Sequence, residues 1–193
     1  MATDSSSIDY RITSTTQILV TSESGDKLAV KSNIGFKTAA VDEQKNRLVI
    51  QPSIVKQTIT GIGSSFTESS AFVLAHLETE QRDKIMQDVY SENGANFSLA
   101  RTPIGATDFS VEGKYSYAEV AGDAALENFS IEVDQDGFSR AQYPGIKDES
   151  FDVLPMIQQV LDIKQQQADK EFRIIASAWT APPWMKDINT WYI

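Results

Sequence analysis

Two indole side chains, and the turn that carries them, are the residues of this sequence best suited to chemistry. Trp179 and Trp184 flank Pro182-Pro183, just after the apolar run Phe172–Ser177. Such a run is typical of a strand buried on both faces, and the prolines, which lack a backbone donor, predict that the strand ends there. Ligands of parallel α/β folds bind beyond the carboxyl ends of the strands. A flat apolar ring there suits the C–H face of a sugar; two core tryptophans under a loop are the alternative.

Two earlier strand-like segments also end in residues with functional side chains. Gly61, Gly63, Ser64, Ser65, Phe66, Thr67 and Glu68 follow Gln57–Thr60, whereas Arg101, Pro103, Asp108 and Phe109 end or follow Phe97–Arg101. In a barrel these strand ends face one pocket, where carboxylates bind hydroxyls and indoles stack. The alternatives stay open, because Arg101 in an ordinary ion pair with Asp108 or Glu68 explains the charges equally well. The Gly-x-Gly signal is weak, since the third glycine of a dinucleotide fingerprint is missing.

Composition excludes several classes of function. The 193 residues carry a net charge of −10, which argues against nucleic acid and anionic membranes as partners. Cysteine is absent, and the single histidine, His76, lies in a helical pattern, so thiol and Ser-His-Asp catalysis have little support. We expect no cofactor and no bound metal. No apolar run approaches the roughly 20 residues of a membrane span. The acidic stretch from Glu119 to Asp152 is expected to be a solvated loop.

The order of elements predicts an α/β fold in two parts. Residues 1–56 contain β-patterned segments at 10–20, 27–37 and 47–51, with turn residues at Ser24–Asp26. From residue 57 the order is strand, helix, strand, helix, strand, which begins a parallel sheet with right-handed crossovers. Helices are expected from Thr67 to Ala75, from an N-cap at Thr79 to Asn93-Gly94, and from Phe151 to Gln167. Pro103 is expected to end the second strand. The loop at 102–150 is long enough to indicate function.

Several motifs in residues 57–193 resemble glycoside hydrolase family 30, the family of glucosylceramidase and related β-glycosidases. The matching segments, in family order, are Thr60–Ala71, Tyr90–Gly94, Ala100–Ser110, Tyr115–Ala118, Asn128–Ser130 and Ala176–Lys186. The resemblance implies the first part, about three strands, of a (β/α)₈ TIM barrel at 57–193. It also implies that residues 1–56 supply strands of a side β-sandwich.

The same resemblance implies a retaining β-glycosidase with two catalytic glutamates. In this family the acid/base follows an asparagine, and no Asn-Glu pair occurs in these 193 residues. We therefore expect both catalytic residues beyond Ile193, and the chain to be an inactive, marginally stable fragment. Substrate binding is what carries over, at positions that match the family's sugar subsite and its surrounding loop: Glu68, Trp179, Arg101, Asp108 and Trp184. One departure is Ser64, where members commonly have glycine.

Other functions remain open at this stage. A complete, non-catalytic carbohydrate-binding protein is the alternative, and a structural protein with a sticky aromatic surface is a third. Glucosylceramide, β-1,6-glucan and aryl β-glycosides are all candidate substrates. Family resemblance implies secretion or a periplasmic location, although Met1–Ser7 lacks the basic and apolar regions of a signal peptide.

Overall fold

The chain forms two compact units, Met1–Val55 and Lys56–Ile193. The structure, a computed structural model, describes residues 16–35, 46, 51 and 53–191. In the first unit, β1 (Thr16–Val20) pairs antiparallel with β2 (Ala29–Ile34). The turn between them uses Gly25 at φ +108°, as its position in the turn motif predicts. The third predicted strand, at 47–51, falls almost entirely outside the described residues.

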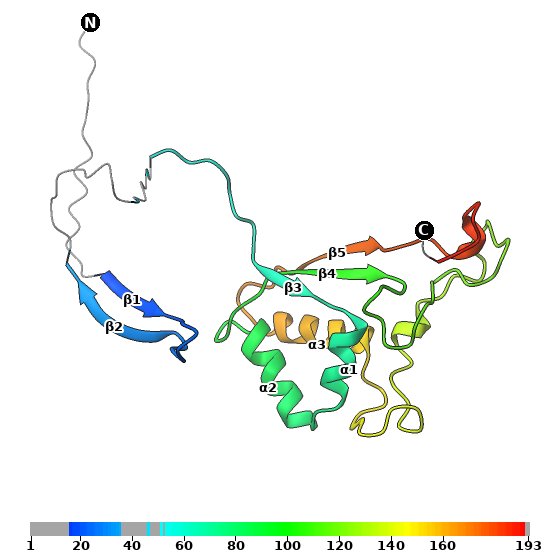
Figure 1. The fold of residues 1–193 in the computed structure, drawn as a ribbon, viewed down its shortest axis with the longest axis horizontal. Helices are drawn as coiled ribbons and strands as arrows, with labels where there is room; N and C mark the ends of the chain where they lie inside the picture. The colour runs from blue at the N-terminus through cyan, green and yellow to red at the C-terminus, as the bar shows by residue number, and fades with distance from the viewer. Residues whose placement is uncertain (1–15, 36–45, 47–50, 52, 192–193) are drawn as a thin grey trace, which may run out of the picture. The chain divides into compact units, whose positions relative to one another are not determined.

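The second unit is built on a three-stranded parallel sheet in the order β3-β4-β5 (Figure 1). The strands are β3 (Gly63–Ser65), β4 (Leu99–Ile104) and β5 (Arg173–Ala178). Helices α1 (Glu68–Ala75) and α2 (Thr79–Tyr90) connect β3 to β4. A long loop with the short 3₁₀ helix η1 (Glu132–Asp134), and then α3 (Val153–Gln165), connects β4 to β5. The predicted alternation of strands and helices is thus confirmed.

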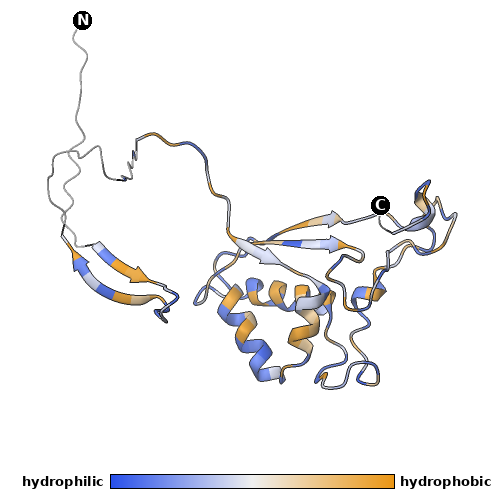
Figure 2. Ribbon diagram, in the orientation of Figure 1, coloured by the Kyte–Doolittle hydropathy of each residue, from blue (hydrophilic) through white to orange (hydrophobic). Residues whose placement is uncertain are grey.

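All three helices cover one face of this sheet (Figure 1), and the core lies between them. Figure 2 shows the hydrophilic residues of α2 on its outer side, away from the sheet. Met86 and Tyr90 of α2 are buried, whereas Ile85 of the same helix is exposed. The buried apolar residues form one cluster: Phe66, Ala71, Ala75, Met86, Tyr90, Ala100, Phe138, Ile146, Phe151, Val153, Met156, Val160 and Ile163.

Helix boundaries agree closely with the sequence pattern. Thr67 caps α1, since its hydroxyl oxygen accepts the Ser70 N–H at 3.1 Å. Thr79 was expected to cap α2 but is the first helical residue, and Glu78 occupies the cap without a side-chain bond. Asp152 caps α3 by accepting the Val153 N–H at 2.7 Å. The helix start points therefore depend on local capping chemistry that the sequence displays.

The expected strand at Gln57–Thr60 is wrong. Residues 57–62 form no strand, and the pairing begins at Gly63. A Cβ at Gly63 would lie 1.7 Å from the Leu99 carbonyl oxygen, so only glycine allows β3 and β4 to approach this closely. Local β-propensity favoured a strand at Thr58–Thr60, but the close approach of the two backbones requires Gly63, three residues further on.

Pro103 does not end β4, as was expected, but lies inside it opposite Ser177 of β5. The Arg101 carbonyl accepts the Phe66 N–H at 2.7 Å, so Arg101 directs its backbone groups toward β3. Pro103, two residues on, also faces that side, beyond the last β3 pair, Ser65 with Arg101. No ladder bond is lost there, and proline is tolerated.

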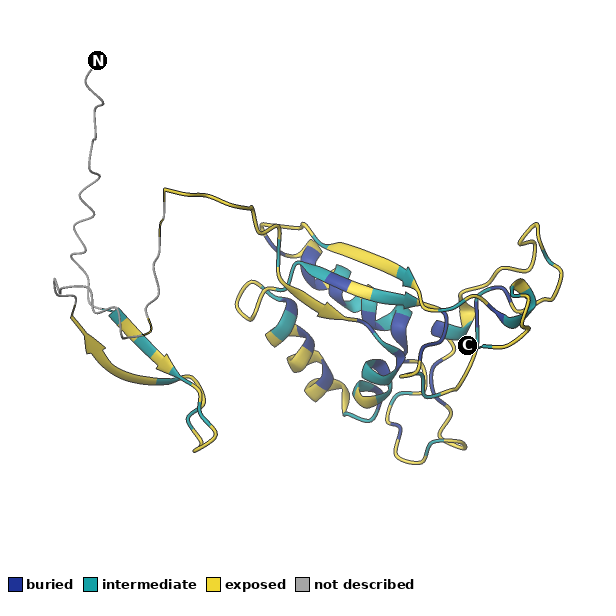
Figure 3. Ribbon diagram, turned by 45° about the horizontal axis from the view of Figure 1, so that its top comes forward, coloured by how far each residue is buried: buried dark blue, intermediate teal, exposed yellow. Residues whose placement is uncertain are grey.

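The prediction that β5 is buried on both faces is also wrong. Ile175 is 62% exposed and Ile174 is 37% exposed. Figure 3 shows β3 and β5 largely exposed on either side of the more buried β4. The helices cover one face of the sheet, and the other face has no cover among the described residues. We call the second face the open face. Within the described part of the chain, no helix is long and apolar enough to span a membrane.

Candidate functional site

Arg101 of β4 and Phe109 of the loop after β4 both contact Trp179, which directly follows β5. The Arg101 guanidinium carbon lies over the Trp179 ring, 5.6 Å from the ring centroid, a cation–π arrangement. Phe109 meets the Trp179 ring edge-on, with 6.3 Å between centroids. Nη2 of Arg101 also donates to the Ser177 hydroxyl at 3.4 Å. Trp179 keeps 42% of its surface exposed, so the indole is both oriented and accessible to a ligand.

Register explains why these side chains share the open face. Arg101 pairs with Ile175 and Pro103 with Ser177, whereas the buried Ala100 pairs with Ile174 on the helix side. Side chains alternate between the faces of a strand, so Arg101 points away from the helices. Ser64, the departure from the family pattern, pairs with Ala100, and its hydroxyl lies 3.1 Å from the Tyr90 hydroxyl. The Ser64 side chain is therefore directed toward the helices and leaves the open face unobstructed.

Glu68 is buried at the start of α1 and is bound to the loop that follows β4. One carboxylate oxygen accepts the Glu112 N–H at 3.1 Å, and the other accepts the Val111 N–H. Burial raises the pKa of Glu68, and the two N–H bonds oppose that rise. Among the described residues, Arg101 makes no ion pair with Glu68 or Asp108. The ordinary ion pair that the sequence left open is therefore not formed in the described residues.

Asp108 and Trp184 occupy different surroundings. Asp108 is exposed and makes no hydrogen bond or ion pair with the part of the chain that the structure describes. Its neighbour Phe109 is fixed by its carbonyl, which accepts the Ser69 hydroxyl. Trp184 lies in the 3₁₀ turn η2 (Pro183–Met185) and donates its indole N–H to the Ala118 carbonyl at 2.7 Å. Of the five predicted site residues, Arg101 and Trp179 are brought into contact, and the loop after β4 connects the others.

Two aspartates of the acidic stretch are buried, which corrects the expectation of a wholly solvated loop. Asp134 is 3% exposed and Asp152 is 2% exposed. Asp134 accepts the Tyr115 hydroxyl at 2.6 Å with one oxygen and the Tyr117 hydroxyl with the other. Burial is the main cause that raises the pKa of Asp152 to about 7, and the nearby Asp134 and Glu68 carboxylates add to it. Burial and Asp134 also raise the pKa of both tyrosines.

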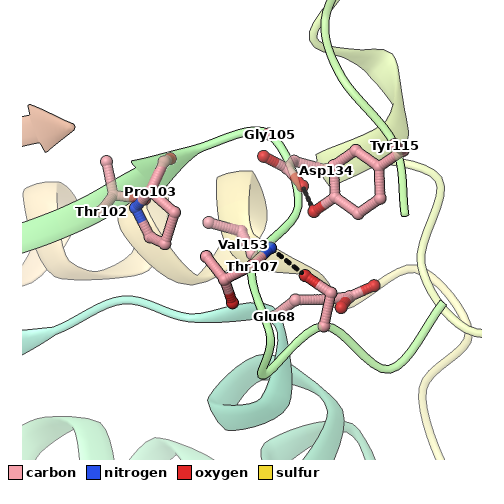
Figure 4. Close-up of a pocket in the computed structure, with 9 residues that line it drawn as sticks. Glu68, Thr102, Pro103, Gly105, Thr107, Tyr115, Asp134 and Val153 are labelled. Carbon is pink, nitrogen blue, oxygen red and sulfur yellow. Dashed lines mark hydrogen bonds between the residues drawn. The ribbon is translucent and has the colours of Figure 1, made fainter. Parts of the chain in front are cut away.

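A small polar cavity lies among these groups (Figure 4). The space in it that the centre of a water molecule can occupy is about 10 Å³, enough for roughly one water. The lining residues are Glu68, Thr102, Pro103, Gly105, Thr107, Ser110, Tyr115, Asp134 and Val153. In the described ranges, no group of three or more acidic or histidine side chains is arranged to hold a metal ion. The cavity therefore suits a bound water that links the carboxylates.

Sequence reasoning missed Asp134, Asp152 and the two tyrosines as parts of this arrangement. Two signals were present. Asp152 directly precedes an apolar helical pattern, which is the position of an N-cap. Tyr115 and Tyr117 are two residues apart, so in extended backbone both point the same way. Neither signal predicts that the acceptor for both hydroxyls is Asp134, which is reached only through the folded loop.

Known proteins resemble most of this chain in sequence. The chain is 31% identical over 140 residues to the putative glucosylceramidase 1 of Caenorhabditis elegans, covering 72% of this chain and 23% of that protein. It is 26% identical over 139 residues to the lysosomal acid glucosylceramidase of Mus musculus, with the same coverage, 72% and 23%. The chain spans about a quarter of the length of these curated relatives.

A solved structure agrees with the sequence relatives. The endo-beta1,6-glucanase BT3312 superposes with a TM-score of 0.53 at 27% identity, over 70% of this chain and 25% of that one. The model of the glycosyl hydrolase family 30 TIM-barrel domain matches residues 59–191, well over half of the sequence. That range contains β3 to β5, the three helices and the Arg101–Trp179 contact, and the chain therefore belongs to glycosyl hydrolase family 30.

Proposed function

We propose that this chain forms the first three strands of the barrel of a retaining β-glycosidase that hydrolyses β-linked glucosides or glucans. The observation that carries the proposal is the accessible Trp179 ring, held by Arg101 and Phe109 at the carboxyl ends of parallel strands. An indole so oriented suits the apolar face of a sugar ring. The named activities of the similar proteins, glucosylceramidase and endo-1,6-glucanase, support the same substrate class.

In this proposal the five predicted residues contribute to the sugar subsite. Trp179 borders the first sugar and Asp108, exposed and unpaired in the described part, accepts its hydroxyls. Arg101 shapes the base of the pocket. Glu68 holds the loop after β4 and presents its remaining lone pairs toward the same space. Trp184 fixes the neighbouring loop through Ala118.

The catalytic glutamates lie outside these 193 residues in the same proposal. Retaining hydrolysis needs two carboxyl groups about 5–5.5 Å apart, one of them a general acid of raised pKa. Glu68 and Asp152 have raised pKa values but are bound by backbone N–H groups, which makes them poor nucleophiles. Residues 1–56 are proposed to belong to a side β-sandwich, which would cover Leu19, Val30 and Ile34 of the hairpin, each more than half exposed.

The test is hydrolysis of aryl β-glucosides by the protein encoded by the whole reading frame that contains this chain. We expect hydrolysis in which the β-anomer of the sugar forms first, as proton NMR of the early product detects. Trp179→Ala is expected to lower kcat/KM by at least tenfold, because the stacking of the indole ring on the sugar is lost. A folded wild-type protein that hydrolyses no β-glucoside or β-glucan contradicts the proposal.

A further inference from the structure

Asp134 is a buried carboxylate that binds two phenol hydroxyls. It is 3% exposed. Both of its oxygens accept phenol hydroxyls, one from Tyr115 and one from Tyr117. A buried carboxylate is costly unless such bonds compensate it, and bonds to a charged acceptor are the strong ones. Asp134 therefore holds both tyrosines firmly.

The two tyrosines in turn fix a short loop of the segment after β4. The Ala106 N–H donates to the Tyr115 carbonyl at 2.9 Å, which closes a loop from residue 106 to residue 115. The Thr107 N–H donates to the Ser110 hydroxyl within it at 3.0 Å. Val111 and Glu112, whose N–H groups hold the Glu68 carboxylate, lie inside this closed loop. Tyr115 thus closes this loop with its backbone carbonyl and binds Asp134 with its hydroxyl.

Glu68, Tyr115 and Asp134 also line the same water-sized cavity (Figure 4). The two carboxylates come from different elements, α1 and η1. Residues of the loop after β4 bind both of them. Other ionisable groups near them are Glu112 and Asp152, both with a pKa raised chiefly by burial. N–H and O–H groups of the loop donate to both carboxylates and help to keep them in place.

We propose that Asp134 is a positioning residue for Glu68. Through Tyr115 and Tyr117 it fixes the loop 106–115, whose Val111 and Glu112 N–H groups orient the Glu68 carboxylate. The consequence for sugar binding rests on the proposed function, whereas the coupling between Asp134 and Glu68 does not. Hydrogen exchange and the Glu68 titration test the coupling itself, whereas KM for a glucoside tests its consequence for the proposed function.

The coupling is tested by hydrogen exchange in the 193-residue chain. Tyr115→Phe removes one donor with little change of shape, and Asp134→Asn removes the charge. We expect the Val111 and Glu112 amides to exchange about tenfold faster in both variants, while the amides of Met86 and Val160 keep their wild-type rates. Tyr90→Phe is the matched control, since its hydroxyl contacts Ser64 and neither Asp134 nor Glu68.

A spectroscopic readout separates positioning from general loosening. The carboxyl carbon of Glu68 is followed by NMR as the pH is changed. Because the Val111 and Glu112 N–H bonds lower the pKa of Glu68 against the effect of burial, the midpoint is expected to rise in Tyr115→Phe, where these bonds weaken, and to stay unchanged in Tyr90→Phe. Wild-type exchange and an unshifted Glu68 midpoint in Asp134→Asn overturn the proposal. Equal acceleration of all amides, including those of Met86 and Val160, also overturns it.

The consequence for function is measured in the protein from the whole reading frame. There, Tyr115→Phe is expected to raise KM for an aryl β-glucoside by about three- to tenfold with a smaller change in kcat, because a hydroxyl-binding group is misplaced. If hydrogen exchange shows the coupling and KM does not change, Glu68 does not bind the sugar, and the proposed role of Glu68 fails while the coupling stands.

Discussion

The two faces of the β3-β4-β5 sheet differ sharply although they are built from adjacent residues. On the helix-covered face, Phe66 and Ala100 are 0% and 3% exposed. On the open face, Arg101 and Ile175 are exposed, and Trp179 presents its ring beyond the strand ends. The difference shows how one strand serves two purposes. One set of alternating side chains stabilises the unit, and the other set is available for binding.

The largest expected effect on stability comes from the covered face. Phe66→Ala removes a fully buried ring that packs against Tyr90 and Phe172, with centroids 5.8 and 6.1 Å away. We expect it to lower the free energy of unfolding by about 3–5 kcal/mol. Ile175→Ala on the open face is the matched control and is expected to cost less than about 1 kcal/mol. Urea denaturation measures both, and equal losses would show that the two faces do not differ.

A second effect comes from the pH dependence of the buried Asp152. Its pKa is raised from 3.8 to about 7, so the folded chain holds a proton to a higher pH than the unfolded chain does. The contribution of Asp152 to the free energy of unfolding is therefore fully present below about pH 4 and is lost as the pH rises through 7, a change of about 4 kcal/mol at most. Asp152→Asn is expected to flatten this decline. Thermal melts between pH 5 and 7.5 measure it, and a slope that Asp152→Asn leaves intact argues against the assignment.

A smaller effect is expected from the ion pair that attaches α2 to the long loop. Arg82 donates to Asp148 at 2.8 Å and lies 4.1 Å over the Phe151 ring, with 9% of its side chain exposed. Arg82→Ala is expected to cost about 2–3 kcal/mol, since it leaves Asp148 unpaired and uncovers the ring. Lys84→Ala breaks the exposed pair with Asp88 and is expected to cost less than about 0.5 kcal/mol. Similar losses for both would contradict this difference in burial.

A small effect on stability is expected at Trp179, where the effect on binding is largest. Trp179→Ala removes an exposed ring of the open face, and we expect the free energy of unfolding to fall by less than about 1 kcal/mol. In the protein from the whole reading frame, affinity for a β-glucoside is expected to fall by at least tenfold. Calorimetry measures both. A variant that unfolds readily yet binds normally would assign Trp179 to the core.

Local rules predicted much of this fold. The starts of α1 and α3 were predicted to within two residues, and β5 follows from its apolar run. The error at β3 arose because Gly63 is required by a close approach of the Leu99 carbonyl, a long-range contact. The exposure of β5 was missed because an apolar run does not reveal which faces are covered.

The candidate site was predictable only in part. Trp179 and Arg101 were expected on one face, and alternation along the strands explains why they meet. The bonds from Val111 and Glu112 to Glu68, and from the two tyrosines to Asp134, join residues 17 to 44 positions apart in the sequence. No local pattern specifies such a loop path, because it is determined by which buried acceptors its donors reach.

The most direct test of the central claim is to read the coding sequence beyond codon 193. In the proposed function, the open face is one side of a sugar site that further barrel strands complete. It predicts an open frame that continues with further strand and helix patterns and an Asn-Glu pair at the end of the next strand. A stop codon at that position would contradict the account of a retaining glycosidase.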